Sequence, residues 1–325
     1  MLIFLQIILL TSLVLSDGNK HEIFSGIAPL SDEMINRINS LNTTWKAGRN
    51  FDPSELEYVK RLLGVKRPVN RVAPPVKHVE ILEDIPDTFD SRSQWPDCPS
   101  ISLIRDQSNC GACWAFGAVG AISDRICIAS TGKVKVNISA EDLVACSGVG
   151  GCDGGWPADA WQYWVTNGLV TGGLYGKEGC MPYAIKPGHH GEPFLPTPAC
   201  NKTCQSGYPK TYAQDKHFGA LSYGIAPDVK VIQSEIMRNG PVEADFQVYS
   251  DFPSYKSGVY IQHSQDLIAG HAIRLIGWGV EGGVPYWLAA NSWNATWGDH
   301  GYFKIRRGTD ECGIEDDIQT GLPKL

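Results

Sequence analysis

The sequence lacks several features that define other classes of protein. After the N-terminus it has no apolar run long enough to cross a membrane, no internal repeat and no low-complexity tract. It also has no excess of basic charge, because 28 Lys and Arg stand against 35 Asp and Glu, a net charge of −7. Domains that bind nucleic acids normally concentrate positive charge in a patch. A nucleic-acid groove is therefore not indicated.

The first 16 residues lack charged side chains altogether. They are almost wholly apolar and end in Leu-Ser before Asp17. This run is too short to span a bilayer and is typical of a secretory signal peptide, although the usual basic n-region is missing. We therefore expect a secreted or endolysosomal protein, whose 10 cysteines mostly pair in an oxidising compartment. Glycosylation sequons agree with this and begin at Asn42, Asn137, Asn201 and Asn294.

Residues 17–84 lack cysteine and are balanced in charge, with 10 Lys/Arg and 10 Asp/Glu. One amphipathic helix is predicted over residues 32–41, behind Ser31. A second is predicted from the capping-box pair Asp52 and Glu55, with Gly64 as its expected end. Prolines at 68, 74 and 75 indicate an extended tether. We expect this region to lie on the body of the protein; the alternative is a small independent domain.

From residue 85 the composition becomes aromatic, glycine-rich and cysteine-containing. Helices are predicted over residues 113–128, 157–166 and 228–238. Strands are predicted over residues 242–248, where apolar and polar residues alternate, and over 273–278 and 286–290. Helices first and strands later predict an α+β architecture of two lobes.

One cysteine, Cys113, stands at the start of a predicted buried helix. The positive end of the helix dipole stabilises a thiolate, which is the form that attacks carbonyl carbon. Cys113 is therefore the candidate nucleophile. The alternative is that Cys110 and Cys113 form a metal-binding or redox C-x-x-C pair. Trp114 in place of further ligands and the predicted signal peptide argue against it.

A thiol nucleophile needs a base with an orienting partner. His271 stands at the head of one predicted strand, and the next strand ends at Asn291. A hairpin that turned at Glu281 would bring Asn291 opposite His271. Trp293 follows, and its indole could shield the bond between imidazole and amide from water.

These residues lie in four blocks that resemble the motifs of the papain-like cysteine proteases. The blocks contain Gln107, residues 110–114 (Cys-Gly-Ala-Cys-Trp), residues 270–272 (Gly-His-Ala) and residues 291–293 (Asn-Ser-Trp). Residues 118–128, 172–175 and 291–297 resemble cathepsin B more closely, and residues 42–51 resemble its propeptide.

The resemblance implies a role for each residue. Cys113 and His271 would form a thiolate–imidazolium pair, Asn291 would orient the imidazole, and Gln107 would complete an oxyanion hole with the backbone N–H of Cys113. The resemblance further implies substrate-binding residues, which are Gly154, Gly155, Trp156, Ala272 and Trp293. It implies no metal or organic cofactor.

The resemblance also implies a disulfide framework, leaving Cys113 and Cys312 free. The pairs are Cys98 with Cys127, Cys110 with Cys152, Cys146 with Cys200, and Cys180 with Cys204. Two further disulfides of cathepsin B are missing, and both partners of each are absent. Ser147 replaces one cysteine, and residues 187–198 contain none. Loss in pairs is what disulfide bonding predicts.

Residues 180–204 resemble the occluding loop that gives cathepsin B its dipeptidyl carboxypeptidase activity. His189 and His190 match the pair that binds a substrate's C-terminal carboxylate, and Asp106 matches the partner of one of them. The loop lacks its internal disulfide and the arginine of its anchoring salt bridge, so we expect a looser flap with weaker exopeptidase action. The alternative is that both histidines are solvated loop residues.

The predicted specificity pocket also departs from cathepsin B. Asp317 matches the acid that accepts arginine at the second residue before the scissile bond, and Asp245 stands where the family has a small residue. Two carboxylates favour a basic substrate residue, or share a proton at low pH. The alternative is that Asp245 faces solvent from its strand.

The sequence thus predicts a papain-like fold made as a precursor. We expect a signal peptide over residues 1–16, an inhibitory helical propeptide over 17–84, and a catalytic domain over 85–325. Within it, a helical left lobe would span about 95–220 and a β-barrel-like right lobe about 221–315, with the active-site cleft between them. Expected partners are protein and peptide substrates, the chain's own propeptide and cystatin-type inhibitors, but no nucleic acid or membrane, and the enzyme would be a monomer.

Two other functions use the same fold. One is a catalytically silent relative that binds peptides or inhibitors, against which the intact Cys113, Gln107, His271 and Asn291 argue. The other is acyl transfer to an amine, which uses the same residues and differs only in the acceptor.

Overall fold

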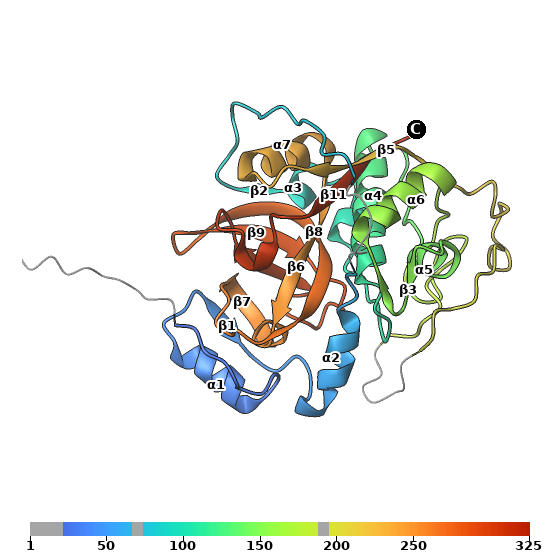
Figure 1. Cartoon of the computed structure of the whole chain (residues 1–325). Coiled ribbons are helices and arrows are strands. Elements are labelled where there is room, and N and C mark those ends of the chain that lie inside the picture. Colours follow the sequence, from blue (N-terminus) through green and yellow to red (C-terminus); the bar gives the residue numbers. More distant parts are fainter. Residues whose placement is uncertain (1–21, 67–73, 188–194) are drawn as a thin grey trace, which may run out of the picture.

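A computed structural model describes residues 22–66, 74–187 and 195–325. One half of the molecule is helical, and the other is a twisted sheet with further helices around it. Helix α4 (Cys113–Ala129) lies between the two halves (Figure 1). This mixed architecture confirms the predicted α+β fold class. The predicted signal peptide lies outside the described residues.

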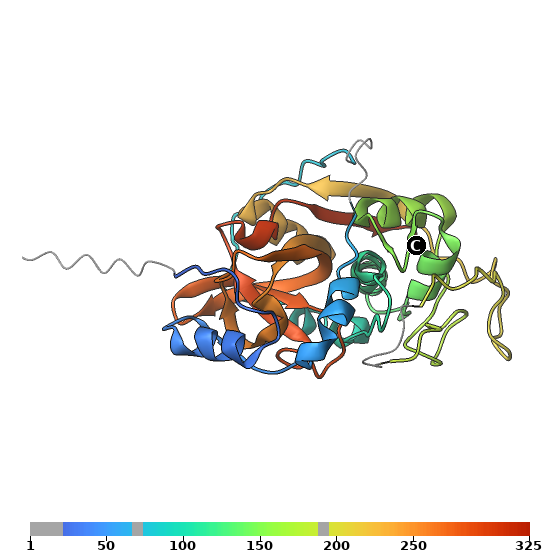
Figure 2. The same ribbon diagram turned by 60° about the horizontal axis from the view of Figure 1, so that its bottom comes forward.

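Residues 22–66 and 74–84, the N-terminal segment, lie against the body as expected. Helix α1 (Asp32–Ser40) begins at Ser31, whose hydroxyl accepts a bond from the Met34 N–H. Strand β1 (Trp45–Ala47) joins the sheet through β7. The capping box of Asp52 and Glu55 forms around the short helix η1 (Pro53–Glu55), which runs into helix α2 (Leu56–Leu62). Figures 1 and 2 both show α2 at the junction of the two halves.

Helix α4 is buried on all sides, since every residue but the last two is shielded from solvent. It packs on strands β6, β8 and β11 on one side and on helix α6 on the other. Its central position follows from the apolar sequence, in which glycine at 117 and 120 permits close approach of the sheet. Before it lie three short elements, β2 (Phe89–Asp90), α3 (Ser91–Gln94) and η2 (Pro99–Ser102).

The helical half also contains α5 (Ala140–Cys146), the hairpin of β3 (Gly150–Gly151) and β4 (Gly154–Gly155), and α6 (Pro157–Asn167). Helix α6 ends at Gly168 with φ of 65°, as its sequence predicts. Helix α5 was not predicted. The structure contains the four disulfides that the resemblance implies, and Cys113 and Cys312 are free.

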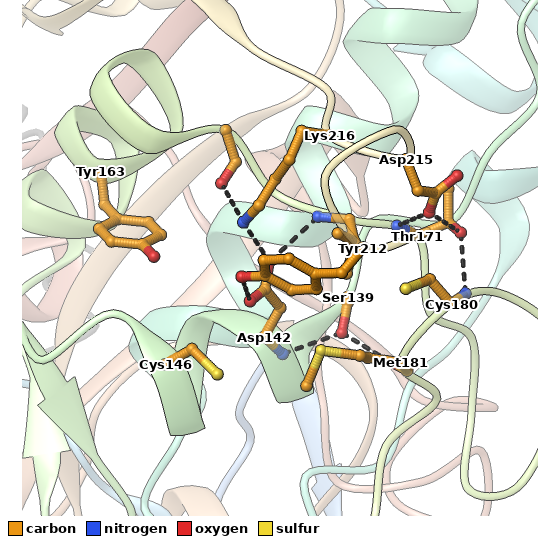
Figure 3. Close-up of polar contacts among 12 residues, drawn as sticks. Ser139, Asp142, Cys146, Tyr163, Thr171, Cys180, Met181, Tyr212, Asp215 and Lys216 are labelled. Atoms are coloured by element: carbon orange, nitrogen blue, oxygen red, sulfur yellow. Dashed lines mark hydrogen bonds and ion pairs between the residues drawn. The ribbon is translucent and has the colours of Figure 1, made fainter. Parts of the chain in front are cut away.

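Two buried carboxylates fix the base of residues 180–204 to the helical half (Figure 3). Asp142 accepts bonds from the Tyr212 hydroxyl at 2.6 Å and from the Lys216 ammonium at 2.9 Å. Asp215 accepts bonds from both the N–H and the hydroxyl of Thr171. Together with two disulfides, this network anchors the chain before and after the loop.

The sheet is formed mainly by the second half of the chain. Its strands are β5 (Gly219–Ile225), β6 (Val242–Tyr249), β7 (Tyr255–Tyr260), β8 (Leu267–Glu281), β9 (Val284–Ala290), β10 (Tyr302–Arg306) and β11 (Ile318–Pro323). Their order is β1-β7-β10-β9-β8-β6-β11-β5, with β2 paired to β8. Helix α7 (Val229–Asn239) and the short helices η3 (Phe252–Ser254) and η4 (Glu311–Gly313) connect them. Strand β11 extends this sheet beyond residue 315, and closure into a barrel stays a prediction.

Two details of the predicted strands are wrong. Strand β6 does not alternate between buried and exposed residues, because Glu243 and Asp245 are buried with their apolar neighbours. In the β8–β9 hairpin the closing pair is Glu281 with Val284, and a bulge at Ile276 shifts the register. The observed pairing, Arg274 with Ala290, does not place Asn291 opposite His271.

Among the described residues, none of the helices has the length and apolarity required to span a bilayer. Within those same residues, no three His, Cys, Asp or Glu side chains gather in a way that could hold a metal ion.

Candidate active site

The thiol of Cys113 lies at the N-terminus of α4 and is fully buried. The N-terminal segment covers it, and the Gly64 N–H donates to Sγ at 3.1 Å. Burial raises the pKa of the Cys113 thiol to about 12, an effect that the backbone donors around the sulfur only partly offset. In this covered state the thiol is neutral, because desolvation outweighs the helix dipole.

The imidazole of His271 lies in hydrogen-bond contact with Asn291, at 2.8 Å between Nε2 and Oδ1. The Ser292 N–H donates to the same Oδ1 at 2.8 Å, which fixes the orientation of the amide. Since Oδ1 can only accept, Nε2 carries the proton of the neutral ring and Nδ1 is the basic nitrogen. Within the described part of the chain, Nδ1 has no hydrogen-bond partner.

The surroundings of His271 are apolar. The Trp293 ring lies 4.7 Å from the imidazole, centroid to centroid, and shields the bond to Asn291 as expected. Burial lowers the pKa of His271 to about 4, partly offset by Asn291. His271 contacts Asn291 although the register of β8 and β9 differs from the predicted one. A diagonal neighbour across two strands is still within reach of long side chains.

Gln107 is held in place from both ends of its amide. Its Oε1 accepts a bond from the Ser292 hydroxyl at 2.7 Å. Its Nε2 donates to the carbonyl oxygens of Leu62 and Cys110, both at 2.9 Å. The amide thus presents N–H groups to a peptide carbonyl beside Cys113. The positioning role of Ser292 was not predicted; its place between Asn291 and Trp293 was the only signal.

Backbone hydrogen bonds hold the N-terminal segment against the β3–β4 hairpin. The Gly155 N–H donates to the Gly64 carbonyl at 2.9 Å, and the Lys66 N–H donates to the Gly155 carbonyl at 2.8 Å. Gly154 has φ of 109°, a conformation that glycine adopts readily. Gly154 and Gly155 therefore present bare backbone to an extended chain.

Gly64 follows Leu63, the C-cap residue of helix α2, where the sequence predicts it, but it does not adopt the positive φ of a glycine cap. Its missing side chain serves the cleft instead. A Cβ built on Gly64 would lie 1.9 Å from the carbonyl oxygen of Gly111. Only glycine lets the N-terminal segment approach Cys113 so closely.

Asp245 is only 3% exposed, so the alternative that it faces solvent is wrong. Its N–H donates to the Asp317 carbonyl at 3.3 Å, and it pairs with Ala272 across β6 and β8. Glu243 lies fully buried on the same strand and accepts a bond from the Trp161 indole at 2.8 Å. Burial raises the pKa of Glu243 well above its usual value, and Asp245 and Asp317 raise it further. Three carboxyl groups therefore share this region, of which the sequence indicated two.

The remaining predicted residues are less fully placed. Trp156 is buried directly before α6, next to Gly155. His189 and His190 lie outside the described residues. Asp106 accepts bonds from the Ser108 N–H at 2.8 Å and from the Asn294 amide at 3.1 Å.

Comparison with known proteins independently supports the assignment of this site to a cysteine protease. The model of the papain family cysteine proteases matches residues 85–322, and the peptidase family C1 propeptide matches residues 30–68. A cathepsin B-like cysteine proteinase of Schistosoma japonicum is 49% identical over 92% of both chains. Cathepsin B-like cysteine proteinase 6 of Caenorhabditis elegans is 47% identical over 96% of this chain and 88% of its own. The solved structure of procathepsin B S9 from Trypanosoma congolense matches with a TM-score of 0.79 at 36% identity, covering 91% of this chain and 99% of its own.

We predict that Gly64→Ala uncovers the thiol in the full-length protein. The new Cβ cannot fit against the Gly111 carbonyl, so the segment must move away from Cys113. Iodoacetamide should then alkylate Cys113 at neutral pH about tenfold faster or more, because exposure restores the thiolate. Gly48→Ala is the control, since its Cβ would meet only the Lys256 side chain. Equal alkylation rates for wild type and Gly64→Ala would contradict the prediction.

Proposed function

The chain belongs to the papain family of cysteine proteases, and on this premise we propose that it hydrolyses peptide bonds with Cys113 as nucleophile and His271 as general base and acid. It is a cathepsin B-like cysteine peptidase made as a proenzyme. One observation carries the proposal. A peptide backbone already lies at the thiol, with the Leu62 carbonyl on the Gln107 amide and the Gly64 N–H on Sγ.

The proposed chemistry follows from these positions. Nδ1 of His271 takes the thiol proton, and the thiolate attacks the substrate carbonyl carbon. The oxyanion that forms accepts bonds from the Gln107 amide and the Cys113 N–H. His271 then protonates the leaving amine, which breaks the peptide bond and leaves a thioester. Water, deprotonated by His271, hydrolyses the thioester and restores the thiol.

Asn291 orients the imidazole throughout this cycle. Its Oδ1 holds the Nε2 proton, so the basic nitrogen stays Nδ1. The burial that keeps Cys113 and His271 neutral comes partly from the propeptide. Its removal would lower the pKa of Cys113 and raise that of His271, which favours the thiolate–imidazolium pair.

We further propose a signal peptide over residues 1–16, a propeptide over 17–84 and a mature enzyme from about residue 85, acting in an endolysosome or after secretion. The mature enzyme would be a monomer that cystatin-type inhibitors block. Besides endopeptidase action it would have dipeptidyl carboxypeptidase action through residues 180–204, with His189, His190 and Asp106. The missing internal disulfide supports a looser flap and weaker exopeptidase action than in cathepsin B.

The test uses the full chain, processed at acidic pH under mildly reducing conditions. We expect activity on a dibasic fluorogenic dipeptide to appear as the propeptide is lost. Dipeptides should be released from the C-terminus of a peptide with a free carboxylate more slowly than internal bonds are cleaved. Cys113→Ala should lower both activities by about 10⁴-fold or more. A processed, folded wild-type protein without activity would favour a silent peptide-binding relative instead, and trapping of the acyl group by added amines would indicate acyl transfer.

A second prediction concerns substrate preference. Asp245 and Asp317 are the carboxyl groups proposed to face a basic substrate residue, so Asp245→Ala should lower kcat/KM for an Arg-Arg substrate about tenfold or more. A Phe-Arg substrate should change little. Asp316→Ala, at an exposed neighbouring acid, is the control. A strong preference of the wild type for Phe-Arg would refute the proposal.

A third prediction concerns release of the propeptide by acid, through His263. Its Nδ1 lies 2.7 Å from the Glu22 carbonyl oxygen and its Nε2 lies 2.7 Å from the Thr43 hydroxyl, so the ring joins two parts of the propeptide. The Trp45 ring of the propeptide stacks on it. Glu311, Arg306 and the Asp251 carboxylate, which accepts the His263 backbone N–H, are the charged groups around it.

Burial lowers the pKa of His263 to about 4, and exposure would return it towards its usual 6.5. Since the covered state has the lower pKa, its binding is strongest above about pH 6.5 and weakens as pH falls towards 4. The test measures how fast added mature enzyme cleaves the propeptide from the Cys113→Ala precursor, divided by its rate on a small peptide at the same pH. This ratio should rise less on acidification when His263 is replaced by Gln. His217→Gln, at a half-buried histidine outside the propeptide interface, is the control. An unchanged pH profile in His263→Gln would contradict this role.

A further inference from the structure

Cys113 comes from helix α4, which lies between the two halves, and His271 comes from strand β8 of the sheet. A catalytic pair must be held to within a fraction of an ångström, because a misplacement of about 1 Å can cost roughly 100-fold in rate. Some contact between α4 and β8 must therefore fix their separation.

One face of α4 provides that contact. Gly117, Gly120 and Asp124 follow Cys113 at intervals of four, three and four residues, so all four lie on the same side of the helix. A Cβ on Gly120 would lie 3.4 Å from Cδ of Arg274 on β8. The two elements do not interlock fully here, since a cavity of about 20 Å³ lies between Gly117, Gly120, Arg274 and Asn291. Apolar packing therefore does not fill this interface completely.

The guanidinium of Arg274 bridges the interface. It pairs with Asp124 at 2.6 Å between Nη1 and Oδ2, and the two side chains are 6% and 0% exposed. It also donates to the carbonyl oxygens of Ser100, Ile101 and Leu103, each at 3.1 Å. One planar side chain therefore joins β8, α4 and η2 with the residue that follows it.

These three segments are the ones that carry the active site. Arg274 stands three residues after His271, Asp124 stands three helical turns after Cys113, and Leu103 stands four residues before Gln107. The buried Arg105 guanidinium, bonded to the Ile138 carbonyl at 2.9 Å, lies near the same cluster and repels Arg274. Asp124 is thus the anion that holds the cluster together.

We propose that Arg274 and Asp124 are positioning residues, which set the distance between Cys113 and His271 and the place of Gln107. This inference rests on the proposed roles of those three residues. A looser pair would weaken the attraction between thiolate and imidazolium. The thiolate would then form only at higher pH.

The test compares processed wild type with Arg274→Met, Arg274→Lys and Asp124→Asn. The rate at which iodoacetamide alkylates Cys113 rises with pH as the thiolate forms, and this rise is the acid limb of the profile. For Arg274→Met we expect its midpoint to move up by about 1 pH unit. At pH 5, kcat per titrated active site should fall about tenfold with KM within about twofold. Arg274→Lys should show a smaller shift in the same direction, since an ammonium keeps the charge but cannot reach all four acceptors.

Lys216→Met is the matched control. It breaks a pair with Asp142 that is as well buried, at 10% and 0% exposed, but lies within the helical half (Figure 3). It should lower the urea midpoint without moving the acid limb. One result would overturn the proposal: an Arg274→Met enzyme that loses stability but whose alkylation midpoint stays within about 0.2 pH units of wild type, where a shift of about 1 unit is expected. If Arg274→Met does not fold, the lysine and asparagine variants decide in the same way. A wild type without an acid limb would overturn the role of Cys113 itself.

Discussion

The burial of helix α4 is the constraint on which the rest of the structure depends. A helix that is shielded on every side needs two partners, and the helical half and the sheet each supply one. Its glycines let the sheet approach, and its charged residues pair with Arg274 of β8 (Asp124) and with Glu235 of helix α7 (Arg125). Because the helix begins at Cys113, the same packing that joins the halves also places the thiol at their junction.

The two candidate catalytic groups are shown here in their covered state. Burial moves the pKa of Cys113 up and that of His271 down, so both are neutral. Neither shift needs a special partner, because desolvation disfavours any charge. On the proposed mechanism, the N-terminal segment would inhibit in two ways, by occupying the place of a substrate and by adding to the burial that keeps both groups neutral.

Much of this could be read from the sequence, and the failures have physical causes. Helix α4 and the capping box at Asp52 were predictable because local signals determine them. The contact of His271 with Asn291 was predicted, but the pairing of β8 with β9 was not. The bulge at Ile276 that shifts this pairing leaves no mark in the alternation of apolar and polar residues. Helix α5 was missed because Glu141 and Asp142 look exposed, yet Ala184 and Lys216, both distant in sequence, satisfy their carboxylates. The tertiary reason for Gly64 could not be read from its neighbours at all.

The internal contacts of the site imply that activation uncovers it and does not rebuild it. His271 is bonded to Asn291, Ser292 to Gln107, and Arg274 to Asp124, and none of these bonds involves the N-terminal segment. That segment touches the catalytic groups through backbone atoms, the Leu62 carbonyl and the Gly64 N–H. Its departure would free the Gln107 amide with its orientation already fixed by Ser292. A substrate carbonyl could then take the place of Leu62, and the cost of arranging the donors has been met during folding, before any substrate arrives.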